Sequence, residues 1–298
     1  MSSVLVLVSG DQQKHLSQTD ISDVQSFLFK HNIQNDALNW LHPDKAAEIY
    51  LSAPLGDDVW RDIRTMMDSR AIDVFCTSAF NRRKKLLLAD MDATIVTGET
   101  LDDLAASAGL KDKISAITER AMRGELDFQS ALVERVAMLS GLSVFALADT
   151  LGAMTLHAGA EDLIRVMRQN GAECYLVSGG FTYFTGAIAA RCGFNGHHGN
   201  ILEIQDGKLT GQVVMPILDK DAKSQFLRHY RDVLSLSIDQ TLAVGDGAND
   251  IPMLVEAGLG VGFHPKPKVK EAVQNWVVHT DLTSLLYIQG YTWQDIAS

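Results

Sequence analysis

The stretch Lys85-Leu86-Leu87-Leu88-Ala89-Asp90-Met91-Asp92-Ala93-Thr94 decides the fold of this 298-residue chain. Its continuous apolar run is typical of a strand that is buried on both faces of a parallel sheet. Two carboxylates, Asp90 and Asp92, follow where this strand ends. Ligands of open parallel sheets bind beyond the carboxyl ends of the strands. The stretch therefore predicts an α/β domain with a polar site after its first strand.

Two later strands also end in polar clusters. Residues 173–177 read as a strand that ends in Ser178-Gly179-Gly180, and residues 241–244 as one that ends in Gly245-Asp246-Gly247-Ala248-Asn249-Asp250. Lys223 lies on the helix that we expect between these two clusters. Because the carboxyl ends of parallel strands share one edge of a sheet, we expect these segments to meet in one crevice.

The region from about Glu99 to Leu151 shows no strand-like alternation, and we expect it to be helical. It forms an insert, at about residues 97–158, directly after the first strand of an α/β domain that we expect to span residues 86–298. Ile201 to Val214 reads as a hairpin that turns at Asp206-Gly207.

Residues 1–80 read as β-α-β-β-α-β, the ferredoxin-like plan, with Asp20 expected to cap the first helix. This order resembles an ACT-type regulatory module, which would imply an amino acid ligand. A docking or dimerisation module without a ligand is the alternative. Residues 81–85 form a basic linker, which we interpret as a solvated connector rather than a nucleic-acid patch.

The carboxylates of the predicted crevice suggest a metal and a phosphate ester. Asp90, Asp92 and Asp246 would repel one another unless a cation lay between them. A hard divalent cation prefers oxygen ligands, and Mg²⁺ fits a site with few protein ligands beside a phosphate. One carboxylate can attack phosphorus, and a second can protonate the leaving alcohol and then activate water. Ser178 and Lys223 offer a hydroxyl and a positive charge to the phosphate.

Each piece alone is a common loop or turn, but their order and spacing resemble the four motifs of the haloacid dehalogenase-like hydrolases. Three further segments resemble the phosphoserine phosphatase branch of that family. They are Glu99-Thr100-Leu101-Asp102, Ala121-Met122-Arg123-Gly124-Glu125-Leu126-Asp127-Phe128, and Arg135. The similarity covers roughly residues 84–280. The family usually has Ser where this chain has Ala93, and we expect activity to survive that difference.

The resemblance implies a role for each matching residue. Asp90 would be the nucleophile and a metal ligand, and Asp92 the general acid and base, with its backbone carbonyl on the metal. Asp246 would complete the metal ligands, supported by Asp250. The remaining residues would bind the substrate: Ser178, Gly179, Gly180, Lys223 and Asn249 around the phosphate, and Glu99, Met122, Phe128 and Arg135 in the helical insert, which would be a cap.

The implied reaction is Mg²⁺-dependent hydrolysis of O-phosphoserine to serine and phosphate, the last step of serine biosynthesis. Glu99 would bind the ammonium of the substrate, and Arg135 its carboxylate. If the resemblance is set aside, Glu99 reads as a helix cap, and Arg135 as a surface partner of Glu134 or Glu119. Two alternatives to the implied reaction stay open: a phosphatase or phosphotransferase for another small phosphomonoester, and an amino-acid-sensing regulatory protein.

Composition narrows the classes of partner. The formal net charge of -11 and the absence of basic stripes argue against nucleic acid. No apolar run approaches the length of a membrane span, and the N-terminus lacks the basic region of a signal peptide. Three scattered cysteines indicate free thiols, and we expect a cytoplasmic location. A homodimer through the N-terminal part is a further expectation.

Overall fold

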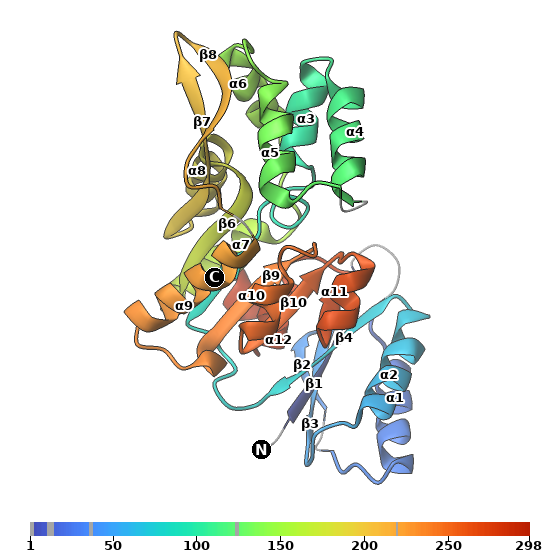
Figure 1. The fold of residues 1–298 in the computed structure, drawn as a ribbon. Helices are drawn as coiled ribbons and strands as arrows, with labels where there is room; N and C mark the ends of the chain where they lie inside the picture. The colour runs from blue at the N-terminus through green and yellow to red at the C-terminus, as the bar shows by residue number, and fades with distance from the viewer. Residues whose placement is uncertain (1–2, 11–14, 36–37, 123–124, 219) are drawn as a thin grey trace.

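Two β-sheets form the framework of the chain (Figure 1). The computed structural model describes residues 3–10, 15–35, 38–122, 125–218 and 220–298. One sheet has seven strands and carries the cap, and the other has four strands and belongs to the N-terminal part. No helix in the described ranges is both long and apolar enough to cross a membrane.

The seven-stranded sheet has β5 near its centre, in the order β11-β10-β9-β5-β6-β7-β8. Neighbouring strands are parallel except for the antiparallel pair β7 and β8. The strands are β5 (Leu86–Ala89), β6 (Glu173–Phe181), β7 (Gly196–Gln205), β8 (Lys208–Val214), β9 (Thr241–Gly245), β10 (Leu259–Phe263) and β11 (Asn275–Val277). Leu87 and Ala89 face one apolar cluster, and Leu86 and Leu88 face another. The prediction of a strand buried on both faces is therefore confirmed.

Helices cover both faces of this sheet. On one face lie α7 (Ala160–Gln169), α8 (Thr182–Cys192) and α12 (Ser284–Ile288), with α13 (Trp293–Ala297) packed against α7. On the other lie α9 (Lys220–Val233), α10 (Ile251–Glu256) and α11 (Pro267–Ala272). A short 3-10 helix, Ile238–Gln240, leads into β9. The sheet is thus the middle layer of three, as expected for an α/β domain.

The cap consists of four helices inserted between β5 and β6: α3 (Thr100–Ser107), α4 (Lys111–Met122), α5 (Phe128–Ala137) and α6 (Val144–Ala153). Figure 1 shows them (green) beside the β7–β8 hairpin (yellow to orange). The backbone amide of Gly141 donates to Leu209 and that of Leu209 to Leu142, both at 2.8 Å. The predicted hairpin turn is confirmed, because Asp206 and Gly207 both have positive φ angles. The hairpin therefore supports the cap as well as closing the sheet.

The N-terminal part has the predicted β-α-β-β-α-β order. Its elements are β1 (Ser3–Ser9), α1 (Gln18–Lys30), β2 (Asn39–His42), β3 (Ala46–Leu51), α2 (Asp57–Asp68) and β4 (Ile72–Ser78). The sheet is antiparallel in the order β2-β3-β1-β4. Asp20 was predicted as the N-cap residue of the first helix, and this was wrong by three residues. The N-cap residue is Ser17, and Asp20 completes its capping box. Leu5 and Leu7 face the helices of this part.

The opposite face of the four-stranded sheet packs on helices of the seven-stranded sheet. Val4, Val6 and Val8 belong to the same buried cluster as α7 and α12. The Asn275 side chain pairs with both backbone polar groups of Cys76, at 2.9 and 3.0 Å. The Asp73 carboxylate accepts from three successive backbone amides that follow β11. This packing supports a docking role, and an amino acid site in the N-terminal part stays a prediction.

The basic linker is not the solvated connector that its composition suggested. The Arg82 guanidinium pairs with the buried carboxylate of Glu48 and donates to the carbonyl of Ile288 at 2.8 Å. Lys84 is 3% exposed, and its Nζ donates to the Asp239 carbonyl at 2.6 Å. Burial lowers the pKa of Lys84 to about 8. Spacing along the chain does not show such contacts, because they are made by segments that are distant in sequence.

Candidate active site

The predicted polar clusters meet at one edge of the seven-stranded sheet, because β6, β5 and β9 are adjacent in its order. Ser178, Gly179 and Gly180 differ slightly from expectation: they belong to β6 itself, where its pairing with β7 is irregular. A cavity of about 630 Å³ opens between this edge and the cap. It is lined by Asp90, Asp92, Glu99, Leu101, Asp102, Thr118, Leu126, Phe128, Ala131, Leu132, Arg135, Ser178, Gly179, Gly180, Phe181, Asp246, Ala248, Asn249 and Lys266.

Three buried carboxylates, Asp90, Asp246 and Asp250, form the floor of the site. One oxygen of each lies within 4.8 Å of the others. The Nζ of Lys223 is 2.7 Å from Asp90 Oδ1 and 2.5 Å from Asp250 Oδ1. Burial and then the charge of Asp250 raise the pKa of Asp90 well above its usual range, although Lys223 opposes this. Burial alone would lower the pKa of Lys223, but Asp250 and Asp90 raise it.

This donor set fits a hard divalent cation. Three carboxylates outnumber the two ammonium groups that pair with them, Lys223 with Asp90 and Asp250 and Lys266 with Asp246. Oxygen ligands are those that Mg²⁺ prefers. Asp250 is already engaged, because its Oδ1 faces Lys223 and its Oδ2 accepts from the Gly247 amide at 3.0 Å. Asp90 and Asp246 are therefore better placed as ligands, with Asp250 in support. A Cβ at Gly245 would lie 2.4 Å from Asp250 Cγ, so this close packing needs glycine.

The Asp92 carboxylate lies apart from this cluster and faces the start of the cap. Its Oδ1 accepts from the backbone amide of Thr100 at 3.0 Å and from the Thr100 hydroxyl. Its Oδ2 accepts from the Ser178 hydroxyl at 3.3 Å. Burial raises the pKa of Asp92, and the hydrogen bonds from Thr100 oppose the shift. The two acids thus have different surroundings, which is the condition for different roles. Metal binding by the Asp92 backbone carbonyl stays a prediction.

The segment Ser178-Gly179-Gly180 at the end of β6, called the Ser178 loop below, is held by an internal hydrogen bond, by close packing on Asp92 and by Asn200. Ser178 Oγ accepts from the Gly180 amide at 2.8 Å. A Cβ at Gly180 would lie 3.0 Å from Ser178 Oγ and 3.1 Å from Asp92 Oδ2, so a side chain there would crowd the site. The buried amide of Asn200 donates to the Gly179 carbonyl at 2.8 Å and accepts from the Leu218 amide at 2.8 Å.

The cap contributes three of its four predicted residues to the cavity: Glu99, Phe128 and Arg135. Phe128 packs on the loop, since a Cβ at Gly179 would lie 3.1 Å from its ring. Burial lowers the pKa of Arg135, and the charges of Asp102 and Glu99 oppose this. The fourth, Met122, ends α4, and its side chain lies outside the described residues.

The alternative in which Arg135 pairs with Glu134 on the surface is wrong. The Glu134 carboxylate pairs with Arg120 at 2.7 Å. Arg135 instead lines the cavity, with its Nε donating to the Ala131 carbonyl at 3.2 Å. Its guanidinium is therefore available at the cavity wall.

Ala93 occupies a left-handed backbone conformation with φ of 51°. Its amide donates to the Gly98 carbonyl at 3.0 Å, and three following amides converge on the Met91 carbonyl. A residue with a Cβ is disfavoured in this region by roughly 1–2 kcal/mol. The turn after β5 is thus defined by backbone hydrogen bonds, which persist without a serine hydroxyl at this position.

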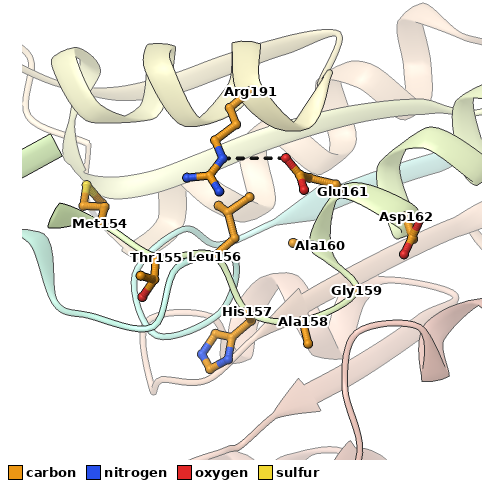
Figure 2. A pocket seen from close by; sticks show the side chains of 10 residues that line it. All are labelled: Met154, Thr155, Leu156, His157, Ala158, Gly159, Ala160, Glu161, Asp162 and Arg191. Carbon is orange, nitrogen blue, oxygen red and sulfur yellow. Dashed lines mark ion pairs between the residues drawn. The ribbon is translucent and has the colours of Figure 1, made fainter. Parts of the chain in front are cut away.

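The two connections of the cap run side by side. Val96 and Leu156 form an antiparallel bridge, and the His157 amide donates to the Ile95 carbonyl at 2.9 Å. The returning connection lines a second hollow of about 370 Å³, where Arg191 and Glu161 face each other at 3.6 Å (Figure 2). None of the predicted site residues lines this hollow, which lies beside a connection of the cap and apart from the site.

Thr100, Asn200 and Lys266 are among the residues in contact with the site that had no predicted role. Thr100 stood in a quoted motif, but its contact with Asp92 is visible only in the fold. Asn200 and Lys266 lie in segments without an unusual pattern. A run such as His264-Pro265-Lys266-Pro267-Lys268 between a strand and a helix signals little more than a turn.

Known proteins resemble this chain in both sequence and structure. The family model of the haloacid dehalogenase-like hydrolases matches residues 87–255. A phosphoserine phosphatase of Streptomyces coelicolor is 36% identical over 257 residues, covering 86% of this chain and 63% of the relative. A HAD family hydrolase of Salmonella enterica serovar Typhi superposes with a TM-score of 0.84 at 28% identity, covering 96% of this chain and 98% of that one.

A solved phosphoserine phosphatase with a phospho-aspartyl intermediate analogue superposes with a TM-score of 0.64 at 36% identity. It covers 68% of this chain, and this chain covers 98% of it. The chain spans only 52 to 63% of the length of three curated relatives that it matches. The matched residues include the ends of β5, β6 and β9, where the acidic cluster and the glycine loop converge. The chain therefore belongs to the haloacid dehalogenase-like hydrolases.

Proposed function

We propose that this protein is a Mg²⁺-dependent phosphatase that hydrolyses O-phosphoserine to serine and phosphate through an aspartyl-phosphate on Asp90. One observation carries the proposal. The cavity that contains Asp90, Asp92 and the Ser178 loop also contains Glu99 and Arg135 from the cap. The groups proposed to hold the phosphate thus line the same space as a pair of opposite charges. The names of the similar phosphatases support the same substrate.

In the first step, a carboxylate oxygen of Asp90 bonds to phosphorus as the ester P–O bond breaks. The leaving seryl oxygen takes a proton from Asp92. The raised pKa of Asp92, caused by burial, favours a carboxyl group that carries this proton. Thr100 holds the carboxyl group at the cap end of the site. Serine is then free to leave through the cavity.

In the second step, water attacks the phosphoryl group on Asp90. Asp92 removes a proton from this water, and the Asp90–phosphorus bond breaks to release phosphate. Ser178, Gly179 and Lys223 would hold the phosphoryl oxygens while charge develops. Both acids return to their starting states, so the steps balance without a further reactant.

Asp90 and Asp246, with the backbone carbonyl of Asp92, would hold Mg²⁺. When bound, the ion would offset the negative charge of the carboxylates and the phosphoryl group. Lys223 pairs with both Asp90 and Asp250, and all three side chains are nearly inaccessible to solvent. Asn249 lines the cavity beside Asp246 and would contact the phosphate.

Substrate choice is assigned to the cap. Arg135 would form a fork-shaped pair with the carboxylate of phosphoserine, and Glu99 would bind its ammonium. Phe128 would wall the pocket over Gly179. Phosphoethanolamine lacks the carboxylate, so Arg135 would have no partner with that substrate.

The deciding experiment measures phosphate release from O-phosphoserine, phosphohomoserine, phosphoethanolamine and p-nitrophenyl phosphate, with Mg²⁺ and with EDTA. We expect the highest kcat/KM for phosphoserine and loss of turnover in EDTA. Equal kcat/KM for phosphoethanolamine would reject the substrate assignment. Turnover that persists in EDTA would reject the metal, and absence of turnover with every ester would favour a regulatory protein.

Two expectations about the whole protein accompany this function. Three buried free thiols support a cytoplasmic location, which cell fractionation would test. A homodimer through the N-terminal part would have to use surface other than its packed sheet face. Analytical ultracentrifugation of the full chain tests the dimer.

A further inference from the structure

Lys266 joins the metal side of the site to the cap. It is the N-cap residue of α11, three residues past the end of β10, and its backbone amide donates to the Asp246 carbonyl at 2.9 Å. Its Nζ lies 3.0 Å from Asp246 Oδ2 and 3.5 Å from Glu99 Oε1. Among the ion pairs of the described residues, these are the ones that Asp246 and Glu99 form. The ammonium of Lys266 therefore pairs with two carboxylates. Asp246 is expected to bind the metal, and Glu99 the ammonium of the substrate.

The electrostatic reason for this bridge is the crowding of like charges. Burial raises the pKa of Glu99, and the charges of Asp92 and Asp246 raise it further, while Lys266 opposes them. Asp246 in turn faces Asp90 and Asp250 across the acidic cluster. Before any ligand enters, Lys266 offsets the repulsion between the two parts of the site.

We infer that Lys266 is a placeholder cation that is displaced by the two cations of the reaction. This inference rests on the proposed function, in which a metal binds Asp246 and the substrate ammonium binds Glu99. The Lys266 side chain is 58% exposed, and its four-carbon stem is flexible, so its ammonium can withdraw into solvent. Its position thus sets how strongly the site attracts cations.

The placeholder role and an ordinary role as a substrate ligand predict opposite changes in binding affinity when the charge of Lys266 is removed. If Lys266 competes with incoming cations, removing its charge leaves the free site more repulsive, and cations bind more tightly. If Lys266 instead holds the phosphate or carboxylate of the substrate, removing it weakens substrate binding. Ion pairs of this exposure are worth about 0.2–1 kcal/mol, or roughly 1.4- to 5-fold in affinity.

The first test needs no turnover. Isothermal titration of the metal-free protein with Mn²⁺ compares wild type with Lys266→Met, Lys266→Arg and Lys268→Met. Lys268 is exposed two residues further along the same segment, and it controls for loss of a surface charge. We expect about two- to fivefold tighter Mn²⁺ binding for Lys266→Met, with the other two variants within error of wild type. Unchanged or weaker binding by Lys266→Met would overturn the inference.

The second test compares substrates at saturating Mg²⁺. The ratio of KM for phosphoserine to KM for p-nitrophenyl phosphate should fall about two- to fivefold in Lys266→Met, because only phosphoserine carries an ammonium. A rise in that ratio overturns the placeholder role and indicates a substrate ligand. Failure of wild type to prefer phosphoserine would reject the proposed function instead, and the Mn²⁺ titration would still decide the role of Lys266 at Asp246.

Discussion

Replacement of Asn200 by alanine is expected to impair both the stability of the catalytic domain and its activity. Asn200 is 1% exposed, and its side chain satisfies the Gly179 carbonyl and the Leu218 amide. Alanine would leave both backbone groups buried and unpaired. Each unpaired group costs about 1–3 kcal/mol, so the free energy of unfolding should fall by roughly 2–6 kcal/mol. For a domain of this size, that corresponds to a fall in Tm of about 5–15 °C.

The effect on activity follows from the position of Gly179. The carbonyl that Asn200 holds belongs to the loop that would bind the phosphate, next to Ser178. A displacement of the loop by about 1 Å can cost on the order of 100-fold in rate. We expect kcat/KM to fall about 10- to 100-fold, and by the same factor for phosphoserine and p-nitrophenyl phosphate, because both carry the phosphate.

The assay combines urea unfolding, followed by circular dichroism, with phosphate release at 25 °C. Asn195→Ala is the matched control. The Asn195 side chain accepts from the backbone amide of Cys174 at 2.9 Å, near the end of β6 that is opposite to Gly179. Asn195 satisfies one buried backbone amide where Asn200 satisfies two backbone groups, so its loss should cost about 1–3 kcal/mol and leave kcat/KM unchanged. Asn200→Ala with a loss below about 1 kcal/mol, or with undiminished kcat/KM, would refute the reasoning.

Three further predictions test other parts of the account. Asp90→Asn should abolish turnover of every ester while the circular dichroism spectrum stays that of wild type, and undiminished hydrolysis would exclude Asp90 as the nucleophile. Arg135→Ala should raise KM for phosphoserine far more than KM for p-nitrophenyl phosphate, and an equal rise for both would argue against carboxylate recognition. Burial raises the pKa of the thiols of Cys76 and Cys192 to about 11 and that of Cys174 to about 12. The native protein at pH 8 should therefore react with dithionitrobenzoate about 100-fold more slowly than the protein unfolded in guanidinium, because the thiolate is the reactive form, and rapid native labelling would contradict the burial of these thiols.

Much of the site could be predicted from local pattern alone. The apolar run before Asp90 identified a strand buried on both faces, and the glycine-bracketed cluster after β9 placed Asp246 and Asp250 beside it. These predictions succeeded because the side-chain period of a strand and the edge at which parallel strands end are properties of the backbone. The cap was expected as a helical insert for the same reason, since its helices show their periodicity locally.

Other features required the tertiary structure. The basic linker resembled a solvated segment, yet Arg82 pairs with the buried Glu48, and Lys84 is buried with its ammonium on the Asp239 carbonyl. The contact of Thr100 with Asp92 joins residues eight positions apart, and that of Lys266 with Glu99 joins residues 167 apart. No periodicity records such pairs, because they depend on how whole elements are packed.

The sequence by itself determined the order of the strands, the helical nature of the insert, the identity of the acidic cluster and the family. Those properties follow from short-range patterns of burial and from residue types that few chemistries share. The tertiary structure alone decided which partner each charged group has. Lys223 is paired with Asp90 and Asp250, Asp92 with Thr100, and Lys266 with two carboxylates on different elements. Charges acquire their pKa values and their roles from such neighbours within a few ångströms, and those distances arise only when the sheet edge and the cap come together.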